Sequence, residues 1–291
     1  MNLTDYNEIQ ALLRRHGFRF SKSMGQNFLI APWVPERIAE SAQLDEKTAV
    51  LEIGPGVGCL TEQLSRRAGK VLAVELDRSL ESVLRETLSG CENVEIRFGD
   101  ILKQDIPALV RDRFGGLRAV VCANLPYNVT SPLLTALIRS DCFDVITVMI
   151  QREVARRICA APNTADYGAF SLFVQWHTEP ELLFDVPPHC FHPQPKVTSS
   201  VIRLTKRKEK PFAVSNEDLL FRIIRAAFNQ RRKTLPNALS SGLGLERGEI
   251  ERALERCGLD ARIRGEALEM AAFVKIADEL AAYDRKTTAD L

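Results

Sequence analysis

The sequence has no apolar run that approaches the roughly 18 residues a membrane-spanning helix requires. Its first residues, Met1–Asp5, have neither the basic start nor the apolar stretch of a secretory signal peptide. Both absences argue against a membrane protein and against a secreted one. We therefore expect a cytoplasmic protein that has no membrane partner.

Cysteine and histidine are too scattered to suggest a disulfide framework or a zinc site. The seven cysteines are an odd number and lie far apart: Cys59, Cys91, Cys122, Cys142, Cys159, Cys190 and Cys257. His189 and His192 lie beside Cys190, but three neighbouring ligands without a distant partner are a weak sign of a metal site. We expect reduced, structural thiols and no bound metal.

The net charge is only +1, so the overall charge does not predict a nucleic-acid ligand. The distribution is uneven, however. Residues 207–233 carry eight basic and three acidic side chains, whereas residues 234–291 carry eight basic and eleven acidic ones. A local basic surface is therefore expected within residues 207–233 although the whole chain is balanced.

Short apolar runs alternate with helical patterns through the first half of the chain. Five runs predict buried strands, at residues 48–53, 70–75, 94–98, 118–123 and 144–150. Apolar residues spaced three or four apart predict helices between them, at residues 60–68, 80–88 and 131–138. This alternation predicts an α/β fold with a parallel sheet covered on both faces. Residues 1–46 are expected to be helical apart from a polar loop at residues 20–27.

A charged break at residues 206–211 separates two kinds of pattern. Before it we expect helices at 152–160 and 168–176, an irregular proline-rich loop at 187–196, and a strand at 198–204 that joins the sheet antiparallel. After it only helical patterns occur. We therefore divide the 291 residues into an α/β domain, residues 1–206, and a small all-helical C-terminal domain, residues 207–291.

The first helix after the break is expected to carry a basic face. Ser215 is the predicted N-cap of this helix, with Asp218 as its acidic third residue. Four polar residues then recur at helical spacing on the face opposite the apolar one: Arg222, Arg225, Asn229 and Arg232.

A glycine-rich turn, Glu52–Gly58, lies between the first strand and the helix that follows it. Gly54, Gly56 and Gly58 allow the backbone to turn sharply and to approach a ligand closely. Their G-x-G-x-G spacing differs from the G-x-G-x-x-G of dinucleotide-binding proteins, and no phosphate-binding lysine follows it. By itself the turn is compatible with a nucleotide-like ligand or with a purely structural role.

Two acids after the next two strands strengthen the ligand interpretation. Glu75 ends the second strand, where a carboxylate is well placed to accept both hydroxyls of a ribose. Asp100 follows the third strand, where it can accept a hydrogen bond from an adenine amine. Either acid alone is explained as well by a loop residue or a helix cap. Together with the glycine turn they predict S-adenosylmethionine rather than NAD, because no phosphate-binding group is present.

A second loop, Asn124-Leu125-Pro126-Tyr127, follows the fourth strand and is the predicted catalytic site. The Asn124 side-chain oxygen and the Leu125 carbonyl can accept both N–H groups of an adenine amine, because Pro126 holds the preceding residue extended. These bonds would direct the nitrogen lone pair toward a methyl group. Tyr127 can stack on a base that has left its helix. The alternative is a structural loop with a buried tyrosine.

These motifs and others along the chain resemble the KsgA family of small-subunit ribosomal RNA adenine dimethyltransferases, and its bacterial branch in particular. The matching stretches are residues 23–29, 52–61, 74–77, 99–100, 124–128, 151–155, 191–199 and 228–235. Each stretch is short, but their order and spacing together are specific. The resemblance implies a class I (Rossmann-like) S-adenosylmethionine-dependent methyltransferase with a small helical C-terminal domain.

The resemblance also implies an activity and a substrate. Family members dimethylate the N6 amines of two adjacent adenosines in a hairpin loop near the 3′ end of 16S rRNA in the 30S particle. The implied cofactor is S-adenosylmethionine, with S-adenosylhomocysteine as the product, and the implied role is in ribosome biogenesis. We expect the protein to act as a monomer.

The family's motifs imply roles for residues that the pattern alone leaves unassigned. Asn27 and Leu29 are implied to contact the methionine end of the cofactor, and Phe191 to stack on the target base opposite Tyr127. The expected cofactor-binding set is Asn27, Leu29, Gly54, Gly56, Glu75, Asp100 and Asn124.

Clustered cations before and after the charged break are candidate RNA contacts, because phosphate binding needs clustered positive charge. The expected set is Arg152, Arg156, Arg222, Arg225, Arg231, Arg232 and Lys233. Pro236 follows Leu235 where relatives often carry a basic residue, which removes one possible contact.

Three alternative functions share some of these features. One is the related enzyme that methylates a single large-subunit rRNA adenine, and another is a DNA adenine methyltransferase. The third is a non-catalytic ribosome-assembly or transcription factor on the same fold. Leu125 and the basic C-terminal motif favour the small-subunit type, no DNA-reading domain is evident, and intact Asn124 and Tyr127 argue for retained chemistry.

Overall fold

The computed structural model of the chain describes residues 1–19 and 26–289, with side chains described as far as residue 281. Residues 20–25 of the expected polar loop, including Ser23, Met24 and Gly25 of the family motif, lie outside the described part. The chain divides into two compact units, Met1–Ala155 with Glu179–Lys206 and Arg156–Thr178 with Arg207–Leu291. The division after residue 206 recurs here, but residues 156–178 group with the C-terminal unit, where the sequence pattern had not placed them.

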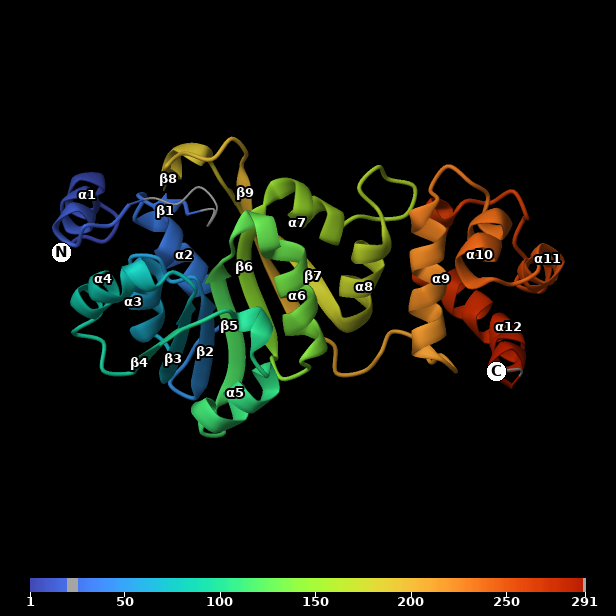
Figure 1. Cartoon of the computed structure of the whole chain (residues 1–291), viewed down its shortest axis with the longest axis horizontal. Helices are drawn as coiled ribbons and strands as arrows, with labels where there is room; N and C mark the ends of the chain where they lie inside the picture. Colours follow the sequence, from blue (N-terminus) through green and yellow to red (C-terminus); the bar gives the residue numbers. More distant parts are fainter. Residues whose placement is uncertain (20–25, 290–291) are drawn as a thin grey trace. The chain divides into compact units, whose positions relative to one another are not determined.

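A seven-stranded sheet lies at the centre of the first unit (Figure 1). The strand order is β4 (Val94–Phe98), β3 (Lys70–Glu75), β2 (Thr48–Ile53), β5 (Arg118–Asn124), β6 (Val145–Gln151), β9 (Ser199–Lys206) and β7 (Thr178–Val186). The strands β2 to β6 pair in parallel, and β9 pairs antiparallel with β6. The structure thus confirms the predicted α/β class and the antiparallel addition.

The edge strand β7 is one element that the sequence pattern did not predict. Glu179, Glu181 and Asp185 are exposed along it, and Pro180 interrupts its hydrogen-bonding capacity. Charged residues and proline on an edge strand discourage pairing with a second chain. The same residues interrupt the apolar alternation on which strand prediction depends, so the sequence pattern does not predict this strand.

Helices cover both faces of the sheet because right-handed crossovers lead away from β2 in two directions. The helices along this part of the chain are α1 (Tyr6–Arg15), α2 (Trp33–Ser41), α3 (Cys59–Ser65), α4 (Glu81–Thr87), α5 (Ile106–Phe114), α6 (Thr130–Arg139) and α7 (Arg152–Ile158). Figure 1 shows α6 lying over the sheet. The short helix α5 was not predicted; Asp105 caps it by accepting a hydrogen bond from the Ala108 N–H at 3.0 Å.

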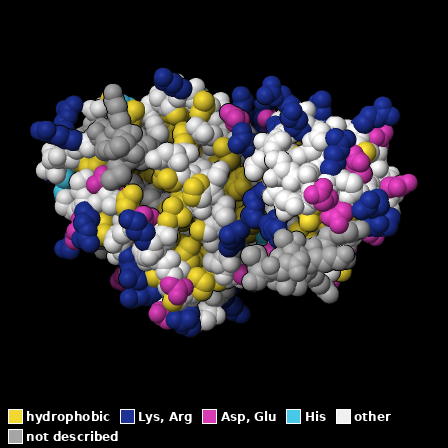
Figure 2. All heavy atoms as spheres, turned by 45° about the vertical axis from the view of Figure 1, so that its right-hand side comes forward, with side chains coloured by type: hydrophobic (Ala, Val, Ile, Leu, Met, Phe, Trp, Pro, Cys, Tyr) yellow, Lys and Arg dark blue, Asp and Glu magenta, His cyan; other side chains and the backbone are white. Residues whose placement is uncertain are grey.

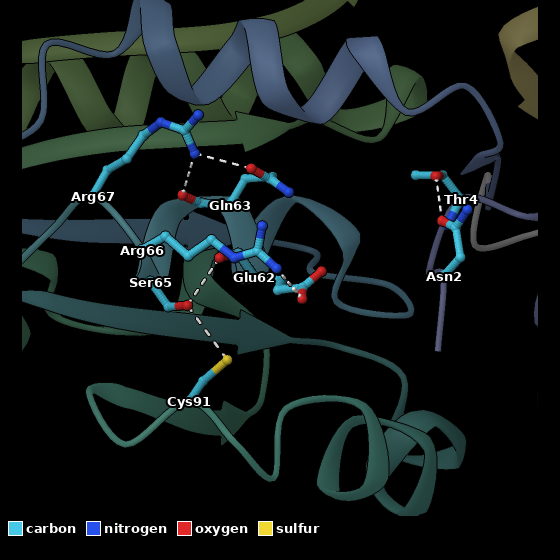
Figure 3. Close-up of polar contacts among 8 residues, drawn as sticks. All are labelled: Asn2, Thr4, Glu62, Gln63, Ser65, Arg66, Arg67 and Cys91. Atoms are coloured by element: carbon cyan, nitrogen blue, oxygen red, sulfur yellow. Dashed lines mark hydrogen bonds and ion pairs between the residues drawn. The ribbon is translucent and has the colours of Figure 1, made fainter.

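The helix after the glycine turn is fixed at its C-terminal end by polar contacts (Figure 3). Ser65 Oγ donates to the Glu62 carbonyl at 2.9 Å and to Cys91 Sγ at 3.3 Å. Arg67 donates to the carbonyl and the side-chain oxygen of Gln63, at 3.0 and 2.9 Å. The Ser65–Cys91 contact ties α3 to the segment before β4, and the Arg67–Gln63 bonds close the end of the helix.

The N-terminal helix α1 packs on the outer side of the glycine turn. Leu12 shares a hydrophobic cluster with Phe28 and with Val57, a residue of the turn. His16, which follows α1, contacts Glu86 of α4 with 2.6 Å between Nε2 and Oε2. Residues that the sequence left without a role thus stabilise the position of the turn.

The second unit is helical, as expected for the C-terminal part of the chain. Its helices include α8 (Ala169–His177), α9 (Glu217–Asn229), α10 (Leu235–Leu243), α11 (Arg247–Arg256) and α12 (Met270–Ala289). Tyr167, Leu172 and Trp176 are buried in one core with these helices, which explains why residues 156–178 belong to this unit. Neither α12 nor any other helix in the described part is long and apolar enough to cross a bilayer.

Two local predictions in this unit are wrong by one turn or less. The N-cap of α9 is Asn216, whose side chain accepts from the Leu219 N–H at 3.0 Å, whereas Ser215 instead donates to Asp278 at 2.7 Å. Because α9 ends at Asn229, Arg232 lies beyond the helix and not on its basic face.

Candidate active site

A cavity of about 210 Å³ opens in the first unit where β2, β3 and β5 end. Parallel α/β sheets bind ligands at this edge, because loops from successive strands converge there. Every residue that we assigned to the cofactor or to the catalytic loop lines the cavity: Asn27, Leu29, Gly54, Gly56, Glu75, Asp100, Asn124, Leu125, Pro126 and Tyr127. Segments far apart in the sequence thus meet at one site.

The glycine turn needs glycine because its backbone is left-handed at alternate positions. The φ angles are +70° at Gly54, +62° at Gly56 and +92° at Gly58, values that other residues rarely adopt. A Cβ atom at Gly56 would also lie 3.2 Å from the ring of Phe28. The turn therefore keeps its shape and its close approach to the cavity only with these glycines.

Glu75 is held by the turn that it faces. One carboxylate oxygen accepts from the Gly56 N–H at 3.3 Å, and the other from the Asp77 N–H at 2.8 Å. The side chain is buried, and burial raises the pKa of Glu75 while these two N–H donors oppose the rise. Each oxygen keeps a second lone pair, so the carboxylate can still accept the hydroxyls of a ribose.

Asp100 both caps a helical turn and faces the cavity. Its Oδ1 accepts from the Leu102 N–H at 3.0 Å, at the start of a short 3-10 turn. The helix-cap alternative is therefore part of its role, yet Asp100 also lines the cavity beside the exposed Leu102. The capping bond fixes the carboxylate, and its other oxygen, Oδ2, lies 4.0 Å from the exposed Lys103 ammonium.

Glu52 is a cavity residue that we did not assign from the sequence. Its side chain is 1% exposed, and its Oε2 has no hydrogen-bond partner among the described residues. Burial, with a smaller effect from Glu75, raises the pKa of Glu52 from 4.5 to about 8. A ligand that brings positive charge beside this oxygen would favour the ionised carboxylate, and S-adenosylmethionine carries both an ammonium and a sulfonium. The sequence feature that could have indicated Glu52 is its position at the start of the glycine turn.

Gln26 and Asp77 are two further polar residues of the lining that sequence reasoning missed. Gln26 Nε2 donates to Asp77 Oδ2 at 2.7 Å. Their bond joins the N-terminal segment that carries Asn27 to the segment after Glu75. The two segments are distant in the sequence, so no local pattern indicated the contact.

The predicted catalytic loop, residues 124–127, leaves the sheet in a fixed conformation. The Leu125 N–H donates to the Met149 carbonyl of β6 at 3.1 Å, and Leu125 is buried. Tyr127 begins a 3-10 turn, and its hydroxyl lies 2.5 Å from Ser199 Oγ on β9. Burial raises the pKa of Tyr127, so its phenol stays neutral at physiological pH.

Among the residues expected at the cofactor or at the target base, Phe191 is the one that does not line the cavity. It is 2% exposed and belongs to a core cluster with Leu29 and Cys190. Its short strand β8 (Phe191–His192) pairs antiparallel with β1 (Phe28–Leu29). Stacking of Phe191 on a base therefore stays a prediction, and it requires the ring to leave this core.

Two of the candidate RNA contacts form ion pairs with nearby acids. Arg152 lies 3.7 Å from Asp185, and Arg231 contacts Glu266 at 3.5 Å and the Ala165 carbonyl. The remaining members of the set are exposed: Arg156, Arg222, Arg225, Arg232 and Lys233. In Figure 2 basic and acidic side chains are interspersed on the face that is shown. Among the described residues no cluster of three or more His, Cys, Asp or Glu side chains could hold a metal ion.

Comparison with known proteins places the chain in a family. A model of the family described as ribosomal RNA adenine dimethylase matches residues 17–282. The ribosomal RNA small subunit methyltransferase A of Lachnoclostridium phytofermentans is 46% identical over 280 residues, covering 95% of this chain and 97% of the relative. That of Geobacillus thermodenitrificans is 47% identical over 274 residues, covering 92% and 94%.

Solved structures with the same fold agree with this placement. The 23S rRNA methyltransferase ErmE is 27% identical with a TM-score of 0.68, covering 88% of this chain and all of its own. A dimethyladenosine transferase from Plasmodium falciparum, at 24% identity and a TM-score of 0.71 over 89% of this chain and 98% of its own, shares the fold. The chain belongs to the ribosomal RNA adenine dimethylase family.

Proposed function

We propose that the chain uses S-adenosylmethionine to dimethylate the N6 amines of two adjacent adenosines in the 3′-end hairpin loop of 16S rRNA. The observation that carries this proposal is the shared cavity. It brings the glycine turn, Glu75 and Asp100 together with Asn124 and Tyr127. Relatives named for the small ribosomal subunit, at 46–47% identity over nearly the whole chain, support the choice of rRNA.

The cofactor-binding residues are assigned to different parts of S-adenosylmethionine. Asn27, Leu29 and the buried Glu52 are suited to the charged methionine end. Glu75 accepts the ribose hydroxyls and Asp100 the adenine amine. When bound, S-adenosylmethionine supplies a methyl group already activated by its sulfonium.

The acceptor amine is positioned by the catalytic loop. The Asn124 side-chain oxygen and the Leu125 carbonyl accept its two N–H groups, which frees the nitrogen lone pair from the ring and directs it at the methyl group. Tyr127 stacks on the flipped base. Methyl transfer then depends mainly on alignment, so the site needs no nucleophilic serine or cysteine.

The exposed cations are proposed to bind rRNA phosphates. Arg222 and Arg225 lie on α9, and Arg232 with Lys233 follow its end. Binding to such a set should weaken as salt rises, because phosphate contacts release counterions. A monomer acting on 30S particles in the cytoplasm is consistent with a site formed within one unit.

Methylation of a large-subunit adenine is the second candidate, because ErmE shares the fold at 27% identity. Labelled cofactor incubated separately with immature 30S particles, 50S particles and duplex DNA separates the candidates. We expect label in N6,N6-dimethyladenosine of 16S rRNA. Label confined to 23S rRNA or to DNA would overturn the proposal.

The Asn124→Ala variant tests the proposed catalytic site. We expect it to lose at least about a hundredfold in kcat, because one of two acceptors for the amine is removed. Asn128→Ala is a matched control, since Asn128 is exposed in the adjoining turn and does not line the cavity. Normal methylation by Asn124→Ala would refute the site.

A further inference from the structure

The ring of Tyr127 is held at its far end by a residue of another strand. Ser199, the first residue of β9, places its Oγ 2.5 Å from the Tyr127 hydroxyl. Ser199 pairs with Gln151 at the end of β6, so the backbone that carries its hydroxyl is fixed within the sheet. Tyr127 is thus anchored both through the loop backbone and through its phenol.

The direction of the Ser199 side chain is set by the alternation of a strand. Successive side chains of β9 point to opposite faces. The next residue, Ser200, accordingly donates to Asp185 at 2.5 Å instead. Of these two adjacent hydroxyls, only that of Ser199 contacts the tyrosine.

Burial makes the contact between Ser199 and Tyr127 persistent. Ser199 is fully buried with the phenol in place, so its bond to Tyr127 is shielded from bulk water. A buried hydroxyl without a partner is costly, which disfavours every ring position that breaks the bond. The ring therefore has one strongly preferred orientation before any base arrives.

We propose that Ser199 is a positioning residue that fixes the Tyr127 ring as a base-stacking platform and that it matters most for the second methyl transfer. The proposal rests on the proposed role of Tyr127 at the target base. An unmodified adenine amine has two N–H groups for Asn124 and Leu125. The first transfer breaks the sulfonium–methyl bond, forms an N–methyl bond and releases S-adenosylhomocysteine and one amine proton. Only one N–H then remains to orient the amine by a hydrogen bond.

The loss of one hydrogen bond increases the share of alignment that stacking must supply. A tyrosine ring free to rotate would hold the monomethylated base less accurately than the unmodified one. Because a small misplacement of the reacting atoms slows a reaction strongly, the second transfer should suffer more than the first. Removal of the Ser199 hydroxyl should therefore change the product ratio as well as the rate.

The test measures N6-monomethyladenosine and N6,N6-dimethyladenosine in 16S rRNA by mass spectrometry after a time course with immature 30S particles. The variants are Ser199→Ala, Tyr127→Phe and the double substitution. We expect each single variant to slow the second transfer about tenfold, so that monomethyl product accumulates. The double variant should be no slower than either single one, since both remove the same bond.

Thr147→Val is the matched control for loss of a buried hydroxyl from the same sheet. Thr147 is fully buried on β6, and its Oγ1 has no hydrogen-bond partner among the described residues. The control should keep the wild-type product ratio. Ser199→Ala and Thr147→Val should keep the wild-type affinity for S-adenosylhomocysteine, measured by calorimetry, because neither Ser199 nor Thr147 is part of the cavity lining.

Three results would overturn the inference. They are a wild-type product ratio in folded Ser199→Ala, single effects that multiply in the double variant, and a loss of S-adenosylhomocysteine affinity equal to the loss of rate. If Ser199→Ala does not fold, Tyr127→Phe decides, and a wild-type ratio there overturns the inference. An inactive wild-type protein, or a fully active Asn124→Ala variant, would refute the proposed function instead.

Discussion

At the scale of single residues, the cavity wall depends on properties that the residue type alone does not give. Gly56 differs from a surface glycine because its φ is +62° and Phe28 lies against it. Glu52 differs from a surface glutamate because it is buried beside the cavity with one oxygen unpaired. Substitutions at these positions should therefore have effects that matched residues elsewhere do not show.

Gly56→Ala should weaken cofactor binding about tenfold, because a left-handed alanine costs about 1–2 kcal/mol and its Cβ would press on Phe28. Calorimetry with S-adenosylhomocysteine measures the change. Gly90→Ala is the control, since a Cβ there would meet nothing within 4 Å. Equal affinities of the two variants would contradict the prediction.

Glu52 should make the stability of the unliganded protein fall as pH rises. Its folded pKa of about 8 lies above its ordinary value of 4.5, so folding takes up a proton between these values. The contribution of the protonated Glu52 carboxyl to the free energy of unfolding is fully present below about pH 4.5. It is lost as the pH rises through 8. The stability of the Glu52→Gln variant should not fall over this pH range. Its free energy of unfolding should therefore rise relative to that of the wild type between pH 5 and 8. Urea unfolding at several pH values measures the difference, and parallel pH profiles would contradict it.

At the scale of elements, periodicity predicted the strands and helices that are long or fully buried. Thr48–Ile53 and Lys70–Glu75 match the predicted runs because continuous apolar sequence suits a strand buried on both faces. The elements β1 and β8 have only two residues each and offer no period to detect. The long edge strand β7 was missed because its acids and its proline break the alternation.

Phe191 of β8 was assigned to the target base, but the β1·β8 pair places its ring in the core. We expect Phe191→Ala to destabilise the protein by about 3–5 kcal/mol, because the ring is buried in the core as well as assigned to the base. Urea unfolding measures this. Phe212→Ala provides the comparison, since Phe212 is 40% exposed and should change stability little. Equal, small effects of both variants would mean that Phe191 is not a core residue.

At the scale of the whole molecule, the division into units does not follow a single point in the sequence. Residues 156–178 supply core side chains to the C-terminal unit. One of them is Trp176, whose ring centroid lies 6.2 Å from that of Phe221. The Tyr167 hydroxyl also donates to the Leu268 carbonyl at 2.9 Å. The C-terminal unit therefore needs a segment that precedes the last strands of the sheet.

A fragment of residues 207–291 should fail to unfold cooperatively, because the buried Tyr167, Leu172 and Trp176 are missing from its core. Circular dichroism during heating measures this, with the full chain as the reference. A cooperative transition of the fragment at the Tm of the full chain would contradict the assignment of residues 156–178 to this unit.

The sequence by itself determined the α/β class and the glycine turn and predicted a catalytic role for the loop at residues 124–127, because each rests on local periodicity or on a short motif. It also carried the family resemblance, which the family match confirms. Only the tertiary structure decided what distant segments do together. It joined Gln26 to Asp77 and Tyr127 to Ser199, and it buried Phe191 and the side chain of Glu52. Such contacts depend on the packing of strands and loops far apart in the chain, which no local pattern encodes.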